Sequence, residues 1–330
     1  MKPPALRFVL SFGISAVLVV LLVRSVDAQS LGSALGAADW RLIAPAVGLY
    51  FVAAGLRSAR WGVLLPEHSV STPVLFRALM VGFTVNNLLP VRMGEVARAY
   101  LLARWCHIPY GSTLASLVVE RVLDGLSLSA LLLVALLFVP APGYLLVAGV
   151  LAAGVFTSGA VVVALAAWRS STLLRLVGWV AGLLPPRIGV RIEALAANFT
   201  RALELVHGRA RFARLIGLSL LAWCCELSLF FVLMPSFGLP LSYPLAFLVG
   251  SAANFATLIP SSPGYVGTFD GALITVLRDT VGVAAGPATA YAIVVHATLF
   301  VPVVIVGTLV LWLSHTSFEQ VTHVPATSAG

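Results

Sequence analysis

Long apolar runs alternate with short polar segments along the whole chain. About six of these runs are close to the roughly twenty residues that a helix needs to cross a bilayer, so they predict about six transmembrane helices. They cover residues 5–23, 42–65, 113–139, 143–167, 213–234 and 286–313. The first run also has the features of a secretory signal, because Lys2 and Arg7 precede it and Val26, Asp27 and Ala28 resemble a cleavage site.

Two further apolar stretches, 73–104 and 243–278, are interrupted by proline and glycine. A shift of 170 residues superposes the two interruptions and aligns Leu88 with Leu258, Pro90 with Pro260, Gly94 with Gly264 and Val96 with Val266. We predict two re-entrant helical hairpins, because broken helices of this kind meet at mid-membrane in transporters. Full spans are the alternative, and they would leave Arg92, Arg98 and Arg104 outside the membrane or in lipid.

These elements predict an all-α integral membrane protein with one polytopic domain over residues 1–313. Each half, about 5–139 and 143–313, would contribute three crossings, and an odd number makes the repeat inverted. Residues 314–330 are polar and are expected to form a disordered tail.

The charge distribution predicts the orientation. Residues 169–214 contain eight arginines against two glutamates, so the positive-inside rule places this segment, and then both termini, in the cytoplasm. Apolar residues recur at helical spacing on both sides of Pro185 and Pro186, which predicts two amphipathic helices near the membrane surface. The arginines serve either to set this topology or to attract anionic lipids.

The composition supports a membrane protein and excludes several other classes. Of 330 residues, 60% are hydrophobic and 10% are charged, which is incompatible with a soluble globular enzyme. The net charge of +8 is explained by arginines between the spans, so we expect no nucleic-acid partner. Three cysteines without metal-ligand spacing, and the absence of nucleotide-binding motifs, predict no metal and no cofactor.

Charged residues inside an apolar span are the most informative candidates for function. Glu120, Arg121 and Asp124 lie within 113–139, and the first and last share one helical face. Three charges at the centre of a span cost on the order of 8 to 10 kcal/mol, so this helix needs polar partners. The most plausible partners are Arg92, Glu95 and Arg98.

Two interpretations of this charged group remain open. It is either a structural ion-pair cluster or a polar cavity. In a cavity, Arg92, Arg98 or Arg121 would bind a phosphate. Glu95, Glu120 or Asp124 would then balance the charge or carry a proton.

The two interruptions offer further polar groups. Asn86 and Asn87 can satisfy backbone groups freed by Pro90. At the second interruption, Ser261, Ser262, Gly264 and Gly267 would form one of two features. The first is the start of a half-helix, whose exposed amides and hydroxyls attract anions. The alternative is a tight turn without a ligand. Asp270, Glu226 and His296 either join helices or lie on the transport path, and we expect Arg57 and Arg60 to be snorkelling anchors.

Three segments carry a family resemblance. They read NNLLPVRMGEVARAYLL from Asn86, ERVLDGL from Glu120 and PSSPGYVGTFDGAL from Pro260. In this order they resemble signature blocks of the lysylphosphatidylglycerol synthase transmembrane-region family, which includes the flippase half of the multiple peptide resistance factor. The resemblance implies a multi-pass protein of the bacterial inner membrane that moves a lipid between leaflets through a lipid-accessible cavity. It makes Arg92, Glu95, Arg98, Glu120, Arg121, Asp124 and the turn from Pro263 to Gly267 the functional positions.

The chain departs from the family pattern in two places. The third block more often reads PGGxGxxE, whereas Tyr265 and Asp270 stand here at the second Gly and the Glu. Only a short tail follows residue 313, so we do not expect this chain to synthesise lysylphosphatidylglycerol.

The sequence thus predicts a flippase-like transporter, not an enzyme, that accepts an anionic or aminoacylated phospholipid or a polyprenyl or hopanoid-type lipid. The alternatives are a membrane-embedded head-group transferase with Glu95 as base, or an accessory subunit of a separate lipid-modifying synthase. Membrane lipids are the expected partners. The candidate substrate-binding residues are Asn86, Asn87, Arg92, Glu95, Arg98, Glu120, Arg121, Asp124, Ser261, Ser262, Pro263, Gly264, Tyr265, Gly267 and Asp270.

Overall fold

The computed structural model describes residues 28–65, 69–89, 93–204, 208–259 and 263–314, and every element in these ranges is a helix. The all-α class is therefore confirmed for this part of the chain. The α-helices are α2 (Ala28–Gly36), α3 (Ile43–Leu64), α4 (Thr72–Leu88), α5 (Gly94–Cys106), α6 (Tyr110–Leu136), α7 (Gly143–Trp168), α8 (Ser170–Gly182), α9 (Pro186–Glu204), α10 (Arg209–Leu233), α11 (Tyr243–Ala256), α12 (Thr268–Val281) and α13 (Ala285–Leu313). Three 3₁₀ turns join them, namely η1 (Trp40–Leu42), η2 (Met234–Phe237) and η3 (Pro263–Tyr265).

Within the described ranges, four helices are long and apolar enough to cross a membrane. They occupy Trp40–Leu64, Gly143–Ala166, Arg209–Phe237 and Ala285–Leu313, in agreement with four of the predicted spans. The predicted span 113–139 is also a long helix, α6, but its charged residues distinguish it from the other four. The predicted span 5–23 and the tail after Ser314 lie outside the described residues. The predicted total of about six spans is not confirmed.

Each interrupted apolar stretch forms a pair of helices around a break. The first pair is α4 and α5, and the second is α11 and α12, with the two members of each pair packed on one another. α4 ends at Leu88 because the residue before a proline disfavours helical backbone, and Leu89 is extended with φ −110° and ψ 142°. The helix–break–helix plan is thus present in both halves, and a re-entrant placement in the membrane stays a prediction.

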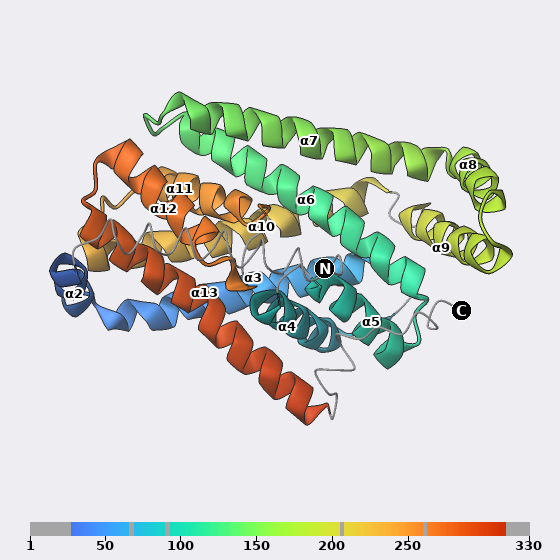
Figure 1. Cartoon of the computed structure of the whole chain (residues 1–330), viewed down its shortest axis with the longest axis horizontal. Helices are drawn as coiled ribbons and strands as arrows, with labels where there is room; N and C mark the ends of the chain where they lie inside the picture. Colours follow the sequence, from blue (N-terminus) through green and yellow to red (C-terminus); the bar gives the residue numbers. More distant parts are fainter. Residues whose placement is uncertain (1–27, 66–68, 90–92, 205–207, 260–262, 315–330) are drawn as a thin grey trace, which may run out of the picture.

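The arginine-rich segment also forms the two helices that the sequence indicated. α8 and α9 pack on each other, and α9 contacts α6 and α7 as well. In Figure 1 these two helices lie together at one end of the molecule, beyond the end of α7. Their position at a membrane surface remains a prediction.

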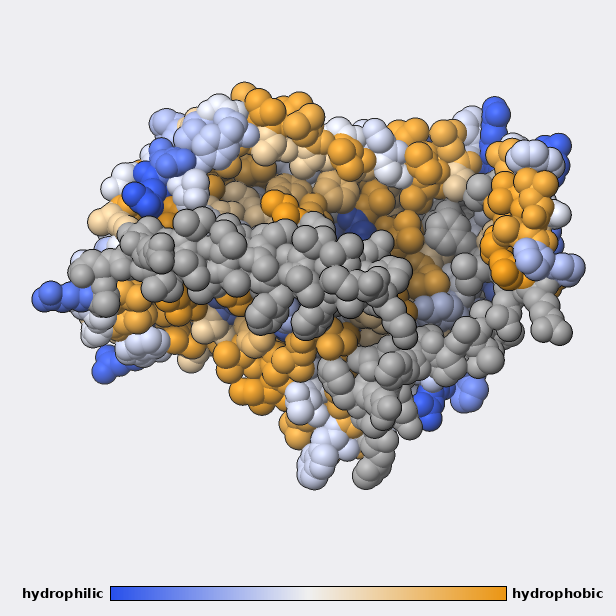
Figure 2. All heavy atoms as spheres, viewed as in Figure 1, coloured by the Kyte–Doolittle hydropathy of each residue, from blue (hydrophilic) through white to orange (hydrophobic). Residues whose placement is uncertain are grey.

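The long helices run through the molecule at different tilts. α3 and α10 pack against each other, α7 runs along one edge, and α6 crosses obliquely from α5 to the start of α7 (Figure 1). Only 6% of the apolar stretch of α7 is buried, so this helix presents apolar side chains outward along its length. On the face shown in Figure 2, the described residues expose many apolar side chains between the two ends, and most of the strongly hydrophilic ones lie towards the ends, as expected of a protein that spans a bilayer.

A close crossing of α4 and α5 positions the charged centre of the protein. A Cβ atom on Gly82 would lie 2.9 Å from the carbonyl oxygen of Gly94, and one on Gly94 would collide with the carbonyl oxygen of Gly82. Only glycine at both positions lets the two helices approach so closely. This approach brings the first turns of α5, which carry Glu95 and Arg98, against the interior of the bundle.

Candidate functional site

Glu120 is the centre of a buried ion network. This carboxylate on α6 is fully buried and accepts hydrogen bonds from Arg98 on α5 at 2.6 Å and from Arg121 at 2.7 Å. A third guanidinium, that of Arg60 on α3, lies 3.7 Å away. The network joins three helices, and such pairing is what lets charges stay in an apolar interior.

Asp124 extends the network by one helical turn. Its Oδ1 accepts hydrogen bonds from Arg60 at 2.6 Å and from the indole N–H of Trp223 on α10 at 3.1 Å. Its Oδ2 lies 3.1 Å from Arg121. Arg121 therefore holds both carboxylates of α6, and these contacts fix the orientation of its guanidinium.

A second buried ion pair lies beside the first group. Arg57 on α3 donates to Glu226 on α10, and its guanidinium stacks over Trp223 at 4.6 Å from the ring centre. The expectation that Arg57 and Arg60 are snorkelling anchors is wrong, because they are only 4% and 0% exposed. The sequence signal for both was present, since they lie three residues apart on one face of an apolar helix, where each needs a carboxylate from a neighbouring helix.

The predicted partners of the α6 charges are only partly the observed ones. Arg98 binds Glu120 as expected, whereas Glu95 accepts a 3.2 Å hydrogen bond from the amide of Asn86. The Asn86 side-chain oxygen also accepts from the backbone N–H of Gly94 at 2.7 Å, which confirms its predicted role in satisfying the broken backbone. Asn86 thus positions Glu95 and closes the α4–α5 break at the same time.

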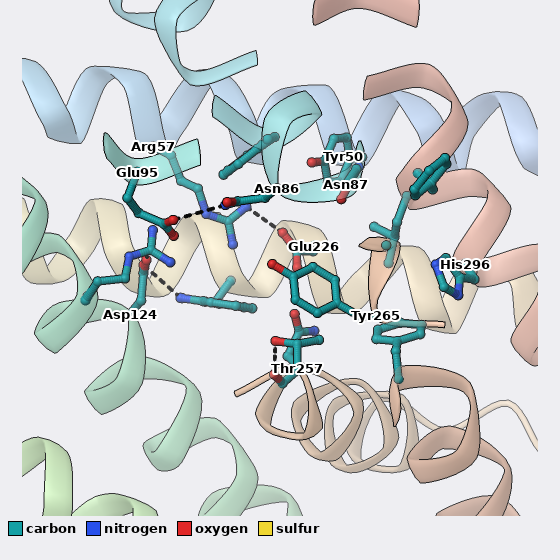
Figure 3. Close-up of a pocket in the computed structure, with 18 residues that line it drawn as sticks. Tyr50, Arg57, Asn86, Asn87, Glu95, Asp124, Glu226, Thr257, Tyr265 and His296 are labelled. Atoms are coloured by element: carbon teal, nitrogen blue, oxygen red, sulfur yellow. Dashed lines mark hydrogen bonds and ion pairs between the residues drawn. The ribbon is translucent and has the colours of Figure 1, made fainter. Parts of the chain in front are cut away.

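The network forms one wall of a cavity with a volume of about 170 Å3. Figure 3 shows the labelled side chains around this space, contributed by both halves of the chain. The charged wall comprises Arg57, Glu95, Arg121, Asp124 and Glu226, and the rest of the lining is aromatic, apolar or uncharged polar, namely Tyr50, Phe83, Asn86, Asn87, Trp223, Asn254, Thr257, Gly264, Tyr265, Phe269, His296, Leu299 and Phe300. One cavity therefore offers a charged surface and an aromatic surface.

The break between α11 and α12 reaches the same cavity. Gly264, Tyr265 and Gly267 all have left-handed backbone, with φ of 71°, 60° and 89°. The turn begins at Pro263 in η3, and Gly264 and Tyr265 line the cavity. Positive φ is strained for tyrosine but not for glycine, so the departure from the family pattern at Tyr265 stands at a strained position.

Asp270 supports this turn from the start of α12. Its Oδ2 accepts a 3.1 Å hydrogen bond from the backbone N–H of Gly267, and its Oδ1 lies 2.7 Å from Nδ1 of His296 on α13. Asp270 is therefore not a lone ionisable group, and it does not line the cavity itself. His296 does line it.

The structure brings most of the predicted site residues to one place. Seven line the cavity, namely Asn86, Asn87, Glu95, Arg121, Asp124, Gly264 and Tyr265. Arg98 and Glu120 lie buried behind the charged wall, and Pro263, Gly267 and Asp270 belong to the turn that borders it. Arg92, Ser261 and Ser262 lie outside the described residues. Among the described residues no group of three metal-ligating side chains is present.

Comparison with known proteins identifies the family. Residues 8–307 match the model of the lysylphosphatidylglycerol synthase transmembrane region. The chain is 30% identical over 84% of its length to Glycosyltransferase AglD of Haloferax volcanii, and it spans about half the length of that relative. It is also similar to two UPF0104 membrane proteins of Methanothermobacter thermautotrophicus, at 24% identity over 78% of the chain and at 25% over 79%.

These relatives change two of the expectations. A relative named as a glycosyltransferase contradicts the expectation that the chain is not an enzyme, so an enzymatic role belongs among the functions to be tested. The family and the several apolar helices together show a multi-pass membrane protein. The named relatives come from archaea, so a bacterial inner membrane and cytoplasmic termini remain predictions.

Proposed function

The chain belongs to the lysylphosphatidylglycerol synthase transmembrane-region family, and on this premise we propose that it moves a phosphate-bearing lipid between the two leaflets of its membrane. The cavity would receive the head group of that lipid. Membership supports a role in membrane lipid biology, and the choice of translocation rests on the geometry of the cavity.

Arg121 is the observation that carries the proposal. Its side chain is 39% exposed at the cavity wall, while those of Arg60 and Arg98 are 0% and 2% exposed. Glu120 and Asp124 hold one side of the Arg121 guanidinium and leave part of it accessible from the cavity. An oriented, partly accessible guanidinium is the group that best matches the paired oxygens of a phosphate.

The remaining lining suits an amphipathic ligand. Arg57 is a second cation of the charged wall, although it is already paired with Glu226. Phe83, Phe269 and Phe300 supply aromatic surface in the same cavity. A lipid head group at the charged wall with its glycerol or prenyl portion against the rings would satisfy both surfaces.

Glu95 supports a further property of the head group. Its carboxylate lines the cavity and accepts an amide hydrogen bond from Asn86, without a guanidinium within ion-pair distance among the described residues. It could therefore pair with an ammonium group while Arg121 holds the phosphate. This arrangement suits anionic phospholipids and their aminoacylated forms, and a polyprenyl phosphate shares the phosphate contact.

The glycosyltransferase relative favours a second candidate function, transfer of a group to a lipid head. The chain would need a base that accepts a proton from the acceptor hydroxyl, and Glu95 is a cavity carboxylate in a fixed position. Product formation by the purified protein, given a polyprenyl phosphate acceptor and a nucleotide-activated sugar, would establish this function.

Lipid exchange in vesicles tests the first proposal. The purified chain is placed in phosphatidylcholine vesicles with a trace of phosphatidylglycerol that carries a fluorescent acyl chain, and a membrane-impermeant reductant reports the outer leaflet. We expect exchange by the wild type and a loss of about tenfold or more in Arg121→Gln, since a charge-assisted contact contributes about 1.5–3 kcal/mol. Arg77→Gln is the matched control, because Arg77 is exposed on α4. Exchange at the wild-type rate by a folded Arg121→Gln protein would overturn the assignment.

A further inference from the structure

An aspartate–histidine pair lies at the cavity, away from the arginine network. His296 on α13 is 16% exposed through its side chain, and Asp270 on α12 is 8% exposed. Nδ1 of His296 and Oδ1 of Asp270 are 2.7 Å apart, although 26 residues separate the two in the chain. Figure 3 shows His296 on the same side of the cavity as Tyr265, across from Asp124 and Glu95.

The pair is held rigidly from several directions. The second oxygen of Asp270 accepts from the Gly267 N–H at 3.1 Å, so the carboxylate cannot rotate without losing the start of α12. The imidazole ring makes edge-to-face contacts with Phe269 and Phe300, with ring centres 5.2 Å and 6.0 Å apart. Because Asp270 occupies Nδ1, a further proton or ligand is left to Nε2, on the opposite edge of the ring.

His296 differs from the other titratable groups of the cavity in how strongly its charge is fixed. Glu120 lies near three guanidinium groups and Asp124 pairs with two, so protonating either would strip several buried cations of their partner. Among the described residues, His296 pairs with one carboxylate, that of Asp270, and protonation would complete this ion pair. It is therefore the better proton carrier.

The groups that surround His296 leave few other sources of positive charge. The elements that pack against α13, the helix of His296, are α12, α4, α3, α10, α2 and η2, and the η3 turn lines the same cavity. The titratable or charged residues that these elements bring to the cavity, or to the ring itself, are Asp270, Tyr50, Arg57, Glu226 and Tyr265, while α4 contributes the neutral amides Asn86 and Asn87. Among described lining residues from α11 onward, His296 alone can take a positive charge.

We propose that His296, held by Asp270, is a second binding site for the lipid phosphate, here called the proton station, which binds the phosphate only when the imidazole is protonated. One proton would then cross the membrane with each anionic head group. This inference rests on the proposed function and supplies its source of energy. At the charged wall, Arg121 and Arg57 balance the phosphate. On the opposite side of the cavity, a phosphate is balanced only when Nε2 of His296 is protonated, and the proton leaves the ring when the head group departs.

The coupling has a numerical consequence. A singly anionic lipid that moves with one proton transfers no net charge, so a membrane potential should not change its distribution between leaflets. A pH difference of one unit corresponds to about 1.4 kcal/mol, or about tenfold. The lipid should therefore accumulate about tenfold in the leaflet that faces the alkaline side. A lipid that moved alone would respond to potential instead, at about 2.3 kcal/mol per 100 mV.

The experiment uses the full chain in phosphatidylcholine vesicles with a trace of acyl-labelled phosphatidylglycerol, with protein-free vesicles as the baseline. A pH difference of one unit and a potassium diffusion potential are imposed separately, and the steady distribution of the label between leaflets is measured. For the wild type we expect about a tenfold asymmetry under the pH difference and none under the potential. A distribution that follows the potential and ignores pH would overturn the inference.

Two variants assign the effect to the pair. His296→Arg keeps a cation at the station but cannot release its proton, so exchange should continue while the response to pH is lost. Asp270→Asn removes the ion-pair partner and should reduce the asymmetry. His107→Gln is the matched control, because His107 is exposed at the end of α5, outside the cavity lining, and this variant should retain the tenfold response. A wild-type response in His296→Arg would contradict the assignment.

The two proposals fail in different ways. If the wild type exchanges no phosphatidylglycerol above the protein-free baseline, the proposed function and the coupling are both wrong. If exchange occurs and depends on Arg121 but shows no pH-driven asymmetry, lipid movement stands and the proton station is rejected.

Discussion

Arg60 donates a 2.6 Å hydrogen bond to Asp124 across 64 residues of sequence, and both side chains are buried. This bond ties α3 to α6 at the charged centre of the bundle. Ser219 on α10 accepts from the same guanidinium nitrogen of Arg60 at 2.9 Å, so a third helix joins at one point. The ion network is consequently both a structural junction and the back of the cavity, and the two roles can be separated by experiment.

Removal of the central negative charge should destabilise the fold. In Glu120→Gln the guanidinium groups of Arg98, Arg121 and Arg60 lose a shared buried partner. We expect a loss of about 3–5 kcal/mol, the usual cost of an uncompensated buried charge. The thermal unfolding midpoint in detergent is the measurement. Glu193→Gln, at an exposed position on α9, should leave the midpoint unchanged. An unchanged midpoint in Glu120→Gln would mean that water, rather than this carboxylate, neutralises the arginines.

The close crossing of α4 and α5 should not tolerate a methyl group. In Gly94→Ala the new Cβ would collide with the Gly82 carbonyl and lie 2.6 Å from the Asn86 side-chain oxygen. We expect a destabilisation of about 1–3 kcal/mol from overpacking, together with reduced lipid exchange because Asn86 no longer positions Glu95. The comparison is Gly55→Ala on α3, where a Cβ meets nothing within 4 Å and alanine should be neutral or slightly stabilising. Equal stability of the two variants would refute the tight crossing.

Helices and breaks, which depend on a single segment, could be predicted from the sequence. Contacts between side chains of different helices could be predicted less well. The cost of placing Glu120 and Asp124 in lipid identified α6 as a helix that needs partners, and the prolines and glycines located both breaks. The identity of the partners depends on which helix covers which face. Arg57 resembles an anchor within its own segment, and its carboxylate, Glu226, is 169 residues away. The positions of Arg57 and Glu226 within their own helices contain no information on which residue of another helix each one pairs with.

Tyr265 should be less favourable than glycine at its own position. Its φ of 60° is in the left-handed region, which costs a residue with a Cβ about 1–2 kcal/mol. Because Tyr265→Gly and Tyr265→Ala both remove the ring, their difference isolates the backbone strain. We expect the glycine variant to be about 1 kcal/mol more stable than the alanine variant, measured as the difference in free energy of unfolding.

A helical tyrosine supplies the control for this comparison. Tyr243 is the first residue of α11, has a negative φ and exposes its side chain, so Tyr243→Ala should there be more stable than Tyr243→Gly. The order of the two variants should thus reverse between positions 265 and 243. The same order at both positions would show that Tyr265 carries no strain.

The pair formed by Arg57 and Glu226 separates folding from function. Glu226→Gln alone leaves the buried guanidinium of Arg57 without its carboxylate and should destabilise the fold by about 3 kcal/mol or more. The double variant Arg57→Gln with Glu226→Gln removes both charges and should recover most of that loss. Both residues line the cavity, so the recovered double variant should still exchange phosphatidylglycerol about tenfold more slowly than the wild type, because one of the two arginines that line the cavity among the described residues is gone. Unfolding midpoints and vesicle exchange rates measure the two effects side by side. A double variant with both wild-type stability and wild-type exchange would assign this pair to helix packing alone and leave Arg121, among the described arginines of the charged wall, to contact the phosphate.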